Sequence, residues 1–529
     1  MRRIRILTVS FAVVALGACA SEPVTGPEAG SALLEEVVTT IGGWDNLSMV
    51  ERQELVTNGR QWEPHQAVRP GAERELNIYN RSMMVDFAGP SVRIEFNGER
   101  TYPSPAPVQF TEIIDGDVGA LVNEDDDGNL TYERMQGSRL QARLRDVQRL
   151  AIHLPFVARD AGDLTRLEDR TIGADTYQVL GYSDLGTTVE VLIRVEGFQK
   201  YPHSVTYLET DPLYGDTRNQ IVFSDWRASQ VGATDEGRAI SVQLPFVQTQ
   251  FLNGDQIAED IFRNIINNGT FGEDAFTIPQ EVRDAPEPGE RILSQITLRR
   301  AGMGFGPLPG YGEVAEVAPL EEVAPGVFQA LGGSHNSMIV EMEDHLIVVE
   351  APLFEERSIG VIEAIAARFP DKPIRYIVMT HYHADHSGGI RTYAGNGATV
   401  IADQSIVPFV EGVLNAPSTV RADVLERSGL TPTVEGVDGS MELTDGTRTV
   451  ELIHVPNAHA EGMLMAYVPD EGIAFVSDLY SPPTPADASN ANARAFYDAV
   501  VEADLDVDTI VGGHGTTGPF QALANVMAN

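Results

Sequence analysis

The pattern of hydrophobic and polar residues divides the chain into two parts. In the first, from residue 75 onward, apolar and polar residues alternate, as in residues 92–96 and 189–193, and Asp-Gly or Asn-Gly pairs separate such stretches. Because successive side chains of a strand point to opposite faces, this alternation predicts antiparallel strands with one buried face. We expect residues 32–285 to form a mainly antiparallel β domain, built as one curved, half-barrel-like sheet with a few helices. The helices are predicted in residues 32–40, 47–56 and 140–150.

A second pattern begins after residue 318. Residues 286–318 are rich in proline and glycine, which is typical of a linker between domains. Beyond them, strand patterns in residues 337–342 and 374–379 flank an amphipathic helix pattern in residues 356–369, and strands and helices then alternate to the C-terminus. The sequence therefore predicts an α+β chain whose second domain, residues 319–529, has alternating strands and helices.

The overall charge narrows the classes of partner. The 529 residues include 77 Asp and Glu against 37 Lys and Arg, which gives a formal charge of −40. Such a chain repels phosphate backbones, and its sequence has no basic patch, so we expect no nucleic-acid partner. The charge favours a neutral or apolar small molecule as substrate over a polyanion.

The N-terminus indicates export. Residues 1–18 combine a basic start, a short apolar run and small residues, which is the pattern of a secretory signal peptide and is too short to span a membrane. The run ends in the residues LGAC, which resemble the lipobox of bacterial lipoproteins; this resemblance implies that Cys19, the only cysteine, carries an acyl anchor. Residues 19–31 are mostly small and polar, as in a tether. We expect a protein that is lipid-anchored to the outer membrane on its periplasmic face.

Three of the eleven histidines fall within six residues of one loop. Residues 380–389 read THYHADHSGG and directly follow a predicted strand, so they lie at its carboxyl end, where α/β sheets place their ligands. In an extended segment His381 and His383 point the same way, whereas Asp385 and His386 turn toward a neighbouring point. Imidazoles and carboxylates in this arrangement suit two metal ions a few ångströms apart.

With this motif, residues 321–529 resemble the metallo-β-lactamase-fold hydrolases, which have an αββα sandwich. In that family a histidine pair and a later histidine hold one zinc, an Asp-His pair and a last histidine hold a second, and an aspartate bridges the two. The resemblance implies the following ligands: His381, His383 and His459 for the first zinc, Asp385, His386 and His514 for the second, and Asp478 as the bridge. The last three positions, His459, Asp478 and His514, each come just after an apolar strand pattern, as the fold requires.

The resemblance also implies a reaction. Two zinc ions that share a carboxylate hold a water between them and lower its pKa from about 16 to near 7, so that a bridging hydroxide attacks an electrophilic carbonyl or phosphorus centre. Asp385 is expected to bind metal and to orient this nucleophile. We expect a dizinc hydrolase that cleaves an ester-like bond, such as a lactone or a thioester. Iron and manganese stay open as alternative metals, because the iron-dependent persulfide dioxygenases of the fold keep much of this motif.

Asp478 bears on the substrate class, and two other positions depart from the common pattern of the family. Asp478 stands where dedicated class B β-lactamases usually carry cysteine or serine, whereas lactonases, thioesterases, phosphodiesterases and alkylsulfatases of the fold have the bridging aspartate. Ser477 replaces a glycine that commonly precedes this aspartate, and Ala460 replaces a threonine often found after the third histidine. Hydrolysis of a β-lactam, a phosphodiester or a sulfate ester is the alternative within the fold.

Three further residues are candidates for the surroundings of the metals. His454 lies five residues before His459, and His335 and Asn336 belong to a loop that resembles the entry to an early strand of the fold. We interpret these three as candidate pocket residues; a core histidine at position 454 and a turn role for His335 are the alternatives. The alternative in which the protein is not an enzyme is a lipid-handling or binding lipoprotein with a vestigial metal domain. The complete set of seven ligands disfavours this alternative. The sequence predicts no particular oligomeric state.

Overall fold

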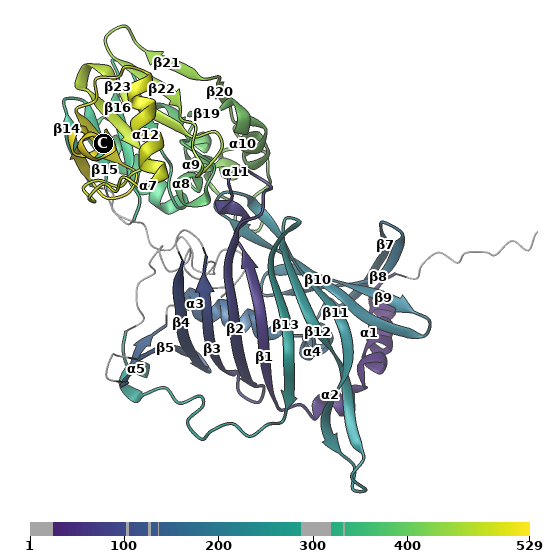
Figure 1. Cartoon of the computed structure of the whole chain (residues 1–529). Coiled ribbons are helices and arrows are strands. Elements are labelled where there is room, and N and C mark those ends of the chain that lie inside the picture. The colour runs from purple at the N-terminus through teal and green to yellow at the C-terminus, as the bar shows by residue number, and fades with distance from the viewer. Residues whose placement is uncertain are drawn as a thin grey trace, which may run out of the picture.

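The computed structural model describes residues 25–101, 105–124, 128–135, 137–286, 319–331 and 334–528. The predicted signal peptide, Cys19, the first part of the tether and residues 287–318 of the predicted linker lie outside these ranges. The described residues form an N-terminal part, dominated by one large sheet, and a C-terminal part with two smaller sheets (Figure 1). No helix within the described ranges has both the length and the apolar character needed to cross a membrane.

The N-terminal sheet has 13 strands in the order β6-β5-β4-β3-β2-β1-β13-β12-β11-β10-β9-β8-β7, and neighbouring strands are antiparallel. The strands are β1 Arg52–Trp62, β2 Glu75–Asp86, β3 Ser91–Arg100, β4 Ala106–Asp115, β5 Val118–Glu124, β6 Leu130–Arg134, β7 Thr165–Ile172, β8 Asp175–Asp184, β9 Thr187–Glu196, β10 Gln199–Asp211, β11 Gly215–Ala233, β12 Ala239–Leu252 and β13 Asp255–Asn267. Two meanders, β1–β6 and β7–β13, are joined where β1 pairs with β13. The predicted mainly antiparallel sheet is confirmed.

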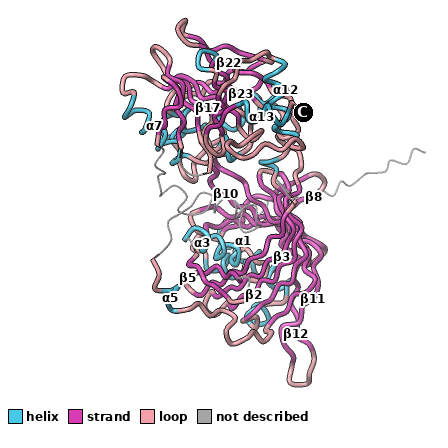
Figure 2. Tube along the Cα trace, turned by 60° about the vertical axis from the view of Figure 1, so that its left-hand side comes forward, coloured by secondary structure: helices cyan, strands magenta, loops and turns pink. Residues whose placement is uncertain are grey.

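Helices lie against one side of this curved sheet (Figures 1 and 2). The helical elements of this part are α1 Pro27–Ile41, α2 Trp44–Ser48, η1 Pro64–Gln66, α3 Gly137–Gln148, α4 Leu154–Asp160 and α5 Gln280–Arg283. The apolar stripe of α1 buries Leu33, Leu34, Val37, Val38 and Ile41 in one core with side chains of the strands. This packing covers one face of the sheet, as the alternating pattern requires.

One predicted helix is wrong. Within residues 47–56, α2 ends at Ser48 and β1 begins at Arg52. Gln53, Leu55 and Thr57 are buried along β1, and the residues between them are more exposed. Two of these three buried side chains are polar, so the alternation is not visible as a hydrophobic pattern. Pairing with β2 on one side and β13 on the other outweighs the local preference of the segment.

The helix-covered side of the sheet also buries charges. Glu112 on β4 accepts a hydrogen bond from Arg143 on α3 at 2.5 Å, and Arg145 on α3 pairs with Glu209 on β10 at 2.7 Å. Buried charges are tolerated in proteins when they are paired in this way. A face filled by helices and ion pairs differs from the open apolar surface that the lipid-handling alternative requires.

The C-terminal part contains two mixed sheets, in the orders β14-β15-β16-β17-β18-β19-β20 and β21-β22-β23-β24-β25-β26. The strands are β14 Leu320–Ala324, β15 Val327–Ala330, β16 Ser337–Glu341, β17 Leu346–Val349, β18 Ile374–Val378, β19 Thr399–Asp403, β20 Val434–Val437, β21 Ser440–Thr444, β22 Thr449–His454, β23 Leu464–Val468, β24 Ile473–Val476, β25 Thr509–Gly512 and β26 Thr517–Pro519. The helical elements are α7 Glu355–Arg368, α8 Ala384–Ser387, α9 Ile390–Gly395, η2 Gln404–Ile406, α10 Val407–Leu414, α11 Val424–Ser428, η3 Pro469–Glu471, α12 Ala491–Glu502 and α13 Phe520–Met527.

Three apolar layers define how these elements stack. The first layer packs α7, through Val361, against the outer face of the first sheet. The second lies between the two sheets and includes Met338 of β16 and Leu452 of β22. The third packs α12, through Phe496, against the outer face of the second sheet. The central strands β17, β23 and β24 are buried on both faces and are continuous apolar runs. The predicted αββα order of layers is confirmed.

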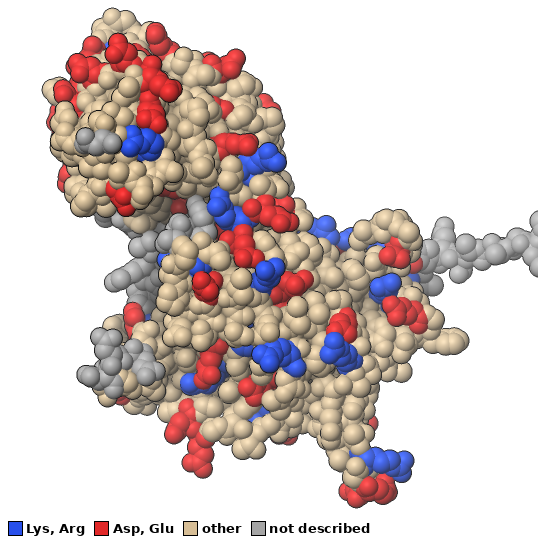
Figure 3. All heavy atoms as spheres, viewed as in Figure 1, with Lys and Arg blue, Asp and Glu red and all other residues tan. Residues whose placement is uncertain are grey.

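The surface charge differs between the two parts. On the face shown in Figure 3, acidic side chains predominate on the C-terminal part, whereas acidic and basic side chains lie side by side on the N-terminal sheet. The acidic excess of the chain is therefore prominent on the part that resembles a hydrolase.

A loop of the C-terminal part docks on the start of β11. The backbone N–H of Asp216 donates to the carbonyl of Pro417 at 2.7 Å. The Asp216 carboxylate accepts hydrogen bonds from the backbone N–H groups of Thr419 at 3.0 Å and Val420 at 2.9 Å. Gly215 has φ +65°, and a Cβ at this position would lie 2.3 Å from the Pro417 carbonyl oxygen. Only glycine allows the two backbones to approach this closely.

We predict that Gly215→Ala loosens this docking and that Gly197→Ala does not. Gly197 has nearly the same φ, +63°, with no atom within 4 Å of a Cβ at this position, so both variants carry the left-handed backbone cost of about 1–2 kcal/mol. Only Gly215→Ala adds a clash with Pro417. Hydrogen exchange measured by mass spectrometry should therefore accelerate in residues 416–420 for Gly215→Ala alone. Equal exchange in the two variants would show that the close approach is unimportant.

Candidate metal centre

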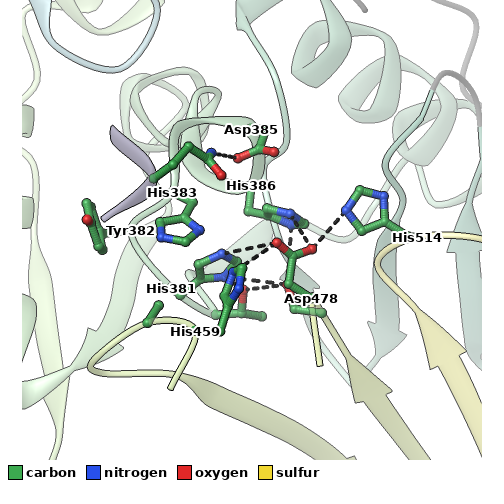
Figure 4. Close-up of polar contacts among 12 residues, drawn as sticks. His381, Tyr382, His383, Asp385, His386, His459, Asp478 and His514 are labelled. Atoms are coloured by element: carbon green, nitrogen blue, oxygen red, sulfur yellow. Dashed lines mark hydrogen bonds and ion pairs between the residues drawn. The ribbon is translucent and has the colours of Figure 1, made fainter. Parts of the chain in front are cut away.

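The predicted metal ligands come together at one end of the αββα sandwich (Figure 4). His381 and His383 lie in the extended segment after β18, and α8, which begins at residue 384, turns Asp385 and His386 toward a different side. The three other predicted ligands follow later strands: His459 comes after β22, Asp478 after β24 and His514 after β25. The motif's glycines let this loop pack tightly, because a Cβ at position 388 would lie 2.0 Å from the carbonyl oxygen of Leu353.

A first group of four side chains is placed to hold a metal ion. The ligand atoms of His381, His383, His459 and Asp478 all lie within 4.8 Å of one another. Two ring nitrogens, His381 Nε2 and His383 Nδ1, are buried and make no hydrogen bond. Buried polar atoms are rarely left without a partner. Nitrogens that converge in this state fit a zinc ion, which prefers imidazole and carboxylate donors.

A second group lies beside the first. His386, His514 and His335 also have ligand atoms within 4.8 Å of one another. Asp478 stands between the groups: its Oδ1 lies 2.8 Å from Nε2 of both His386 and His514, and its Oδ2 lies 3.0 Å from His459 Nε2. One carboxylate oxygen therefore faces each group, as a bridging ligand requires.

Asp385 lies at the edge of the second group. Its Oδ1 accepts a hydrogen bond from the side-chain amide of Gln66 at 2.5 Å, and its Oδ2 lies 3.4 Å from His335 Nε2. It belongs to none of the three described groups whose ligand atoms lie within 4.8 Å of one another. The structure thus brings Asp385 to the site with its carboxylate held by a residue of the N-terminal part.

The outer nitrogen of each of four histidines has a hydrogen-bond partner. His381 Nδ1 lies 3.1 Å from Thr380 Oγ1, and His383 Nε2 donates to the carbonyl of Ala67 at 2.9 Å. The other two contacts are His386 Nδ1 with Glu350 Oε2 at 3.0 Å and His514 Nδ1 with the carbonyl of Ser334 at 2.9 Å. Metal-binding histidines commonly use such partners to fix the ring and its tautomer.

The pKa values of the histidines are shifted in opposite directions in the two groups. Burial lowers the pKa of His381 well below its ordinary value and that of His383 to about 3, so both rings are neutral, which is the form that binds metal. Burial also disfavours a charged His386, but the carboxylates of Asp478, Glu350 and Asp385 outweigh it and raise the pKa of His386 well above its ordinary value. The second group therefore favours a positive charge among carboxylates, and a metal ion would supply one.

The N-terminal part contributes a loop to the site. This loop, residues 63–74 between β1 and β2, carries Gln66 and Ala67, both of which are buried. The Ala67 carbonyl accepts hydrogen bonds from His383 and, at 2.6 Å, from the Tyr382 hydroxyl, whose side chain faces away from the metal-binding side. Glu461 N–H donates to the carbonyl of Val68 at 2.6 Å. No motif in the sequence marks this loop.

The remaining candidates fall in different places. Asn336 donates to the carbonyls of Gly512, at 3.1 Å, and Gly515, at 2.8 Å, on either side of His514, so it holds the loop of a predicted ligand. His454 pairs with Asp403 at 2.7 Å and belongs to none of the described metal-binding groups. Ser477 Oγ lies 3.3 Å from His386 Nδ1, so the serine that replaces the common glycine fits inside the site.

Sequence reasoning missed Glu350, which is fully buried between the two groups. Its Oε1 accepts a hydrogen bond from Thr380 Oγ1 at 2.7 Å, and its Oε2 contacts His386. Its position directly after the apolar run of β17 was a signal that could have been used, because the carboxyl ends of neighbouring parallel strands meet at one edge of a sheet.

A comparison with known protein families finds a match in the C-terminal part of the chain. Residues 330–514 match the model of the metallo-beta-lactamase superfamily. The matched residues lie in the part of the chain that forms the αββα layers.

Individual relatives are distant. The chain is 25% identical over 185 residues to the 2,4-dinitroanisole O-demethylase subunit alpha of a Nocardioides strain, covering 34% of this chain and 51% of the relative. It is 24% identical over 216 residues to a linear primary-alkylsulfatase of a Pseudomonas strain, covering 34% of this chain and 40% of that protein. Among solved structures, a metallo-beta-lactamase from Pontibacter korlensis is similar, with 15% identity and a TM-score of 0.32, over 40% of this chain and 97% of that one. The chain thus spans about half or less of the two curated relatives.

We predict that Gln66→Leu weakens metal binding by about 10- to 100-fold, the usual cost of losing a hydrogen-bond partner of a ligand. Leucine is similar in size but cannot donate to Asp385. Zinc affinity should be measured by competition with a chromophoric chelator. Arg69→Ala is the control in the same loop, because its ion pair with Glu461 is long, at 3.7 Å, and exposed. Equal affinities of the two variants would contradict a role of Gln66 at the site.

Proposed function

We propose that this protein is a zinc-dependent hydrolase that holds two zinc ions and cleaves an ester-like bond, with a lactone or a thioester as the favoured substrate class. The observation that carries this proposal is the position of Asp478, whose two oxygens lie 2.8 Å and 3.0 Å from imidazole nitrogens of two separate groups. A carboxylate shared by two sets of imidazoles is the arrangement that a dinuclear site needs. The buried ring nitrogens without hydrogen bonds support the same proposal.

Zinc ions bound to these groups would supply an activated water molecule and a positive charge for the developing oxyanion. The chain's own residues orient the reactants. Gln66 fixes Oδ1 of Asp385, which leaves Oδ2 on the side of the second group. We assign to Asp385 Oδ2 the orientation of the attacking water and the acceptance of its proton. The carbonyl of Ala67 holds the proton of His383 on Nε2, so that Nδ1 keeps its lone pair for metal.

Two features favour this substrate class: the aspartate at position 478 and the negative charge of the chain. Asp478 occupies the bridging position, which favours ester-cleaving hydrolases over dedicated β-lactamases. The acidic surface favours a neutral or apolar substrate. The distant relatives named as an O-demethylase and an alkylsulfatase extend the test to aryl methyl ethers and sulfate esters.

We predict that the purified protein contains about two zinc ions per chain and that His383→Ala lowers hydrolysis by at least about 100-fold, since one ligand of the first group is lost. Elemental analysis measures the metal, and a panel of lactones, thioesters, phosphodiesters, sulfate esters, aryl methyl ethers and β-lactams measures the reaction. His345→Ala is the control: this buried histidine of the same part pairs with Asp344 and lies outside the described metal-binding groups. A metal-free protein with full activity would refute the proposal.

We further propose that the protein is exported and held by an acyl chain on Cys19 at the periplasmic face of the outer membrane. The basic, apolar and small-residue segments before Cys19 support this proposal.

For this anchor we predict that Cys19→Ser moves the protein from the membrane fraction to the soluble fraction of a bacterial host. Ser21→Ala, two residues beyond, is the control and should stay in the membrane fraction. Unchanged fractionation of the cysteine variant would contradict lipid anchoring.

A further inference from the structure

We propose that His335 is an additional protein ligand of the second metal position, beside Asp385, His386, His514 and the shared Asp478. The inference rests on the proposed two-metal function and extends it, because the ligand set implied by the sequence resemblance does not include this residue. Apart from the shared Asp478, the expected donors at this position are Asp385, His386 and His514. His335 would be the fourth.

The position of the His335 ring carries the inference. The ring is 4% exposed, and its centroid lies 4.7 Å from that of His386 and 4.2 Å from that of His514. One ligand atom from each of these three histidines lies within 4.8 Å of the other two. Three imidazoles this close in a buried place suit a shared cation better than three separate structural roles.

The two nitrogens of His335 have different surroundings. Nδ1 contacts Ser334 Oγ at 2.6 Å, whereas Nε2 is buried and makes no hydrogen bond. The nearest carboxylate oxygen described for Nε2 is Asp385 Oδ2, at 3.4 Å, which is long for a hydrogen bond. An outer nitrogen with a partner and an inner nitrogen without one is also the state of His381 and His383 in the first group.

The backbone around His335 is tied to the loop of a predicted ligand. The Ser334 carbonyl accepts the hydrogen bond from His514 Nδ1 at 2.9 Å, and the backbone N–H of Asn336 donates to the Gly513 carbonyl at 2.8 Å. The residues on both sides of His335 therefore hold the His514 loop. This two-sided attachment keeps the His335 ring beside His514, as two ligands of one metal would need.

The chemical consequence concerns the type of metal. The first group offers three imidazoles and the shared Asp478, which suits four-coordinate zinc. With His335 the second position offers three imidazoles, Asp385 and Asp478. Five protein donors suit a divalent transition metal that accepts five or six ligands, such as zinc in its expanded state, cobalt, manganese or iron.

Cobalt-substituted protein tests the assignment directly. In the proton NMR spectrum of the full chain loaded with two Co²⁺, each ligating histidine with a protected outer N–H gives a strongly shifted exchangeable resonance. We expect His335→Gln to remove one such resonance and to weaken Co²⁺ binding at the second position by at least about 10-fold, with the first position unchanged. His335→Ala should give the same result, and His454→Ala, which changes a hydrogen-bonded histidine outside the groups, should leave both readouts as in the parent protein.

The outcomes separate this inference from the proposed function. If the parent protein binds two Co²⁺ and both His335 variants keep every shifted resonance, His335 is not a ligand, although the two-metal site stands. If the parent protein binds no metal, the proposed function itself fails. Circular dichroism of the metal-free variants checks that they fold, and the assignment is overturned if a folded His335 variant shows the parent spectrum.

Discussion

The hydrogen bond at the outer nitrogen of a ligand histidine, made by His381, His383, His386 and His514, is the interaction on which the site depends. A neutral imidazole carries one proton, and a ligand must carry it on the nitrogen that faces away from the metal. For His381 the direction of this bond follows from its neighbours. Thr380 gives its hydroxyl proton to Glu350, at 2.7 Å, so its oxygen is left to accept from His381 Nδ1. The lone pair of His381 Nε2 is thereby directed toward the centre of the site.

Glu350 connects the two groups of ligands. One carboxylate oxygen acts on His381 through Thr380, and the other contacts His386 directly. The side chain is fully buried, and a carboxylate is stable there because both oxygens have donors. Its backbone has φ +69°, a conformation that costs free energy for any residue other than glycine. The fold therefore accepts local strain at the residue that orients ligands of both groups.

The strand-and-loop pattern of the C-terminal part could be predicted because its chemistry is local. Asp478 and His514 follow β24 and β25, which are buried on both faces, so short apolar runs marked the place of these two ligands. The start of β1 could not be predicted in this way, because polar Gln53 and Thr57 are buried there and hide the alternation. The pairing partners that decide such a segment, β2 and β13, lie elsewhere in the chain.

Contacts between the two parts were beyond the reach of sequence reasoning, and they change how the N-terminal part is understood. Gln66 lies 319 positions before Asp385, and neither Gln66 nor Ala67 belongs to a recognisable motif. Without the Ala67 carbonyl, His383 Nε2 would form a hydrogen bond with water. Water can donate as well as accept, so it does not select one tautomer. A carbonyl only accepts, and it fixes the proton on Nε2. The large β-sheet thus holds a loop that the metal-binding residues need, and the chemistry of the C-terminal part depends on the docking of the two parts.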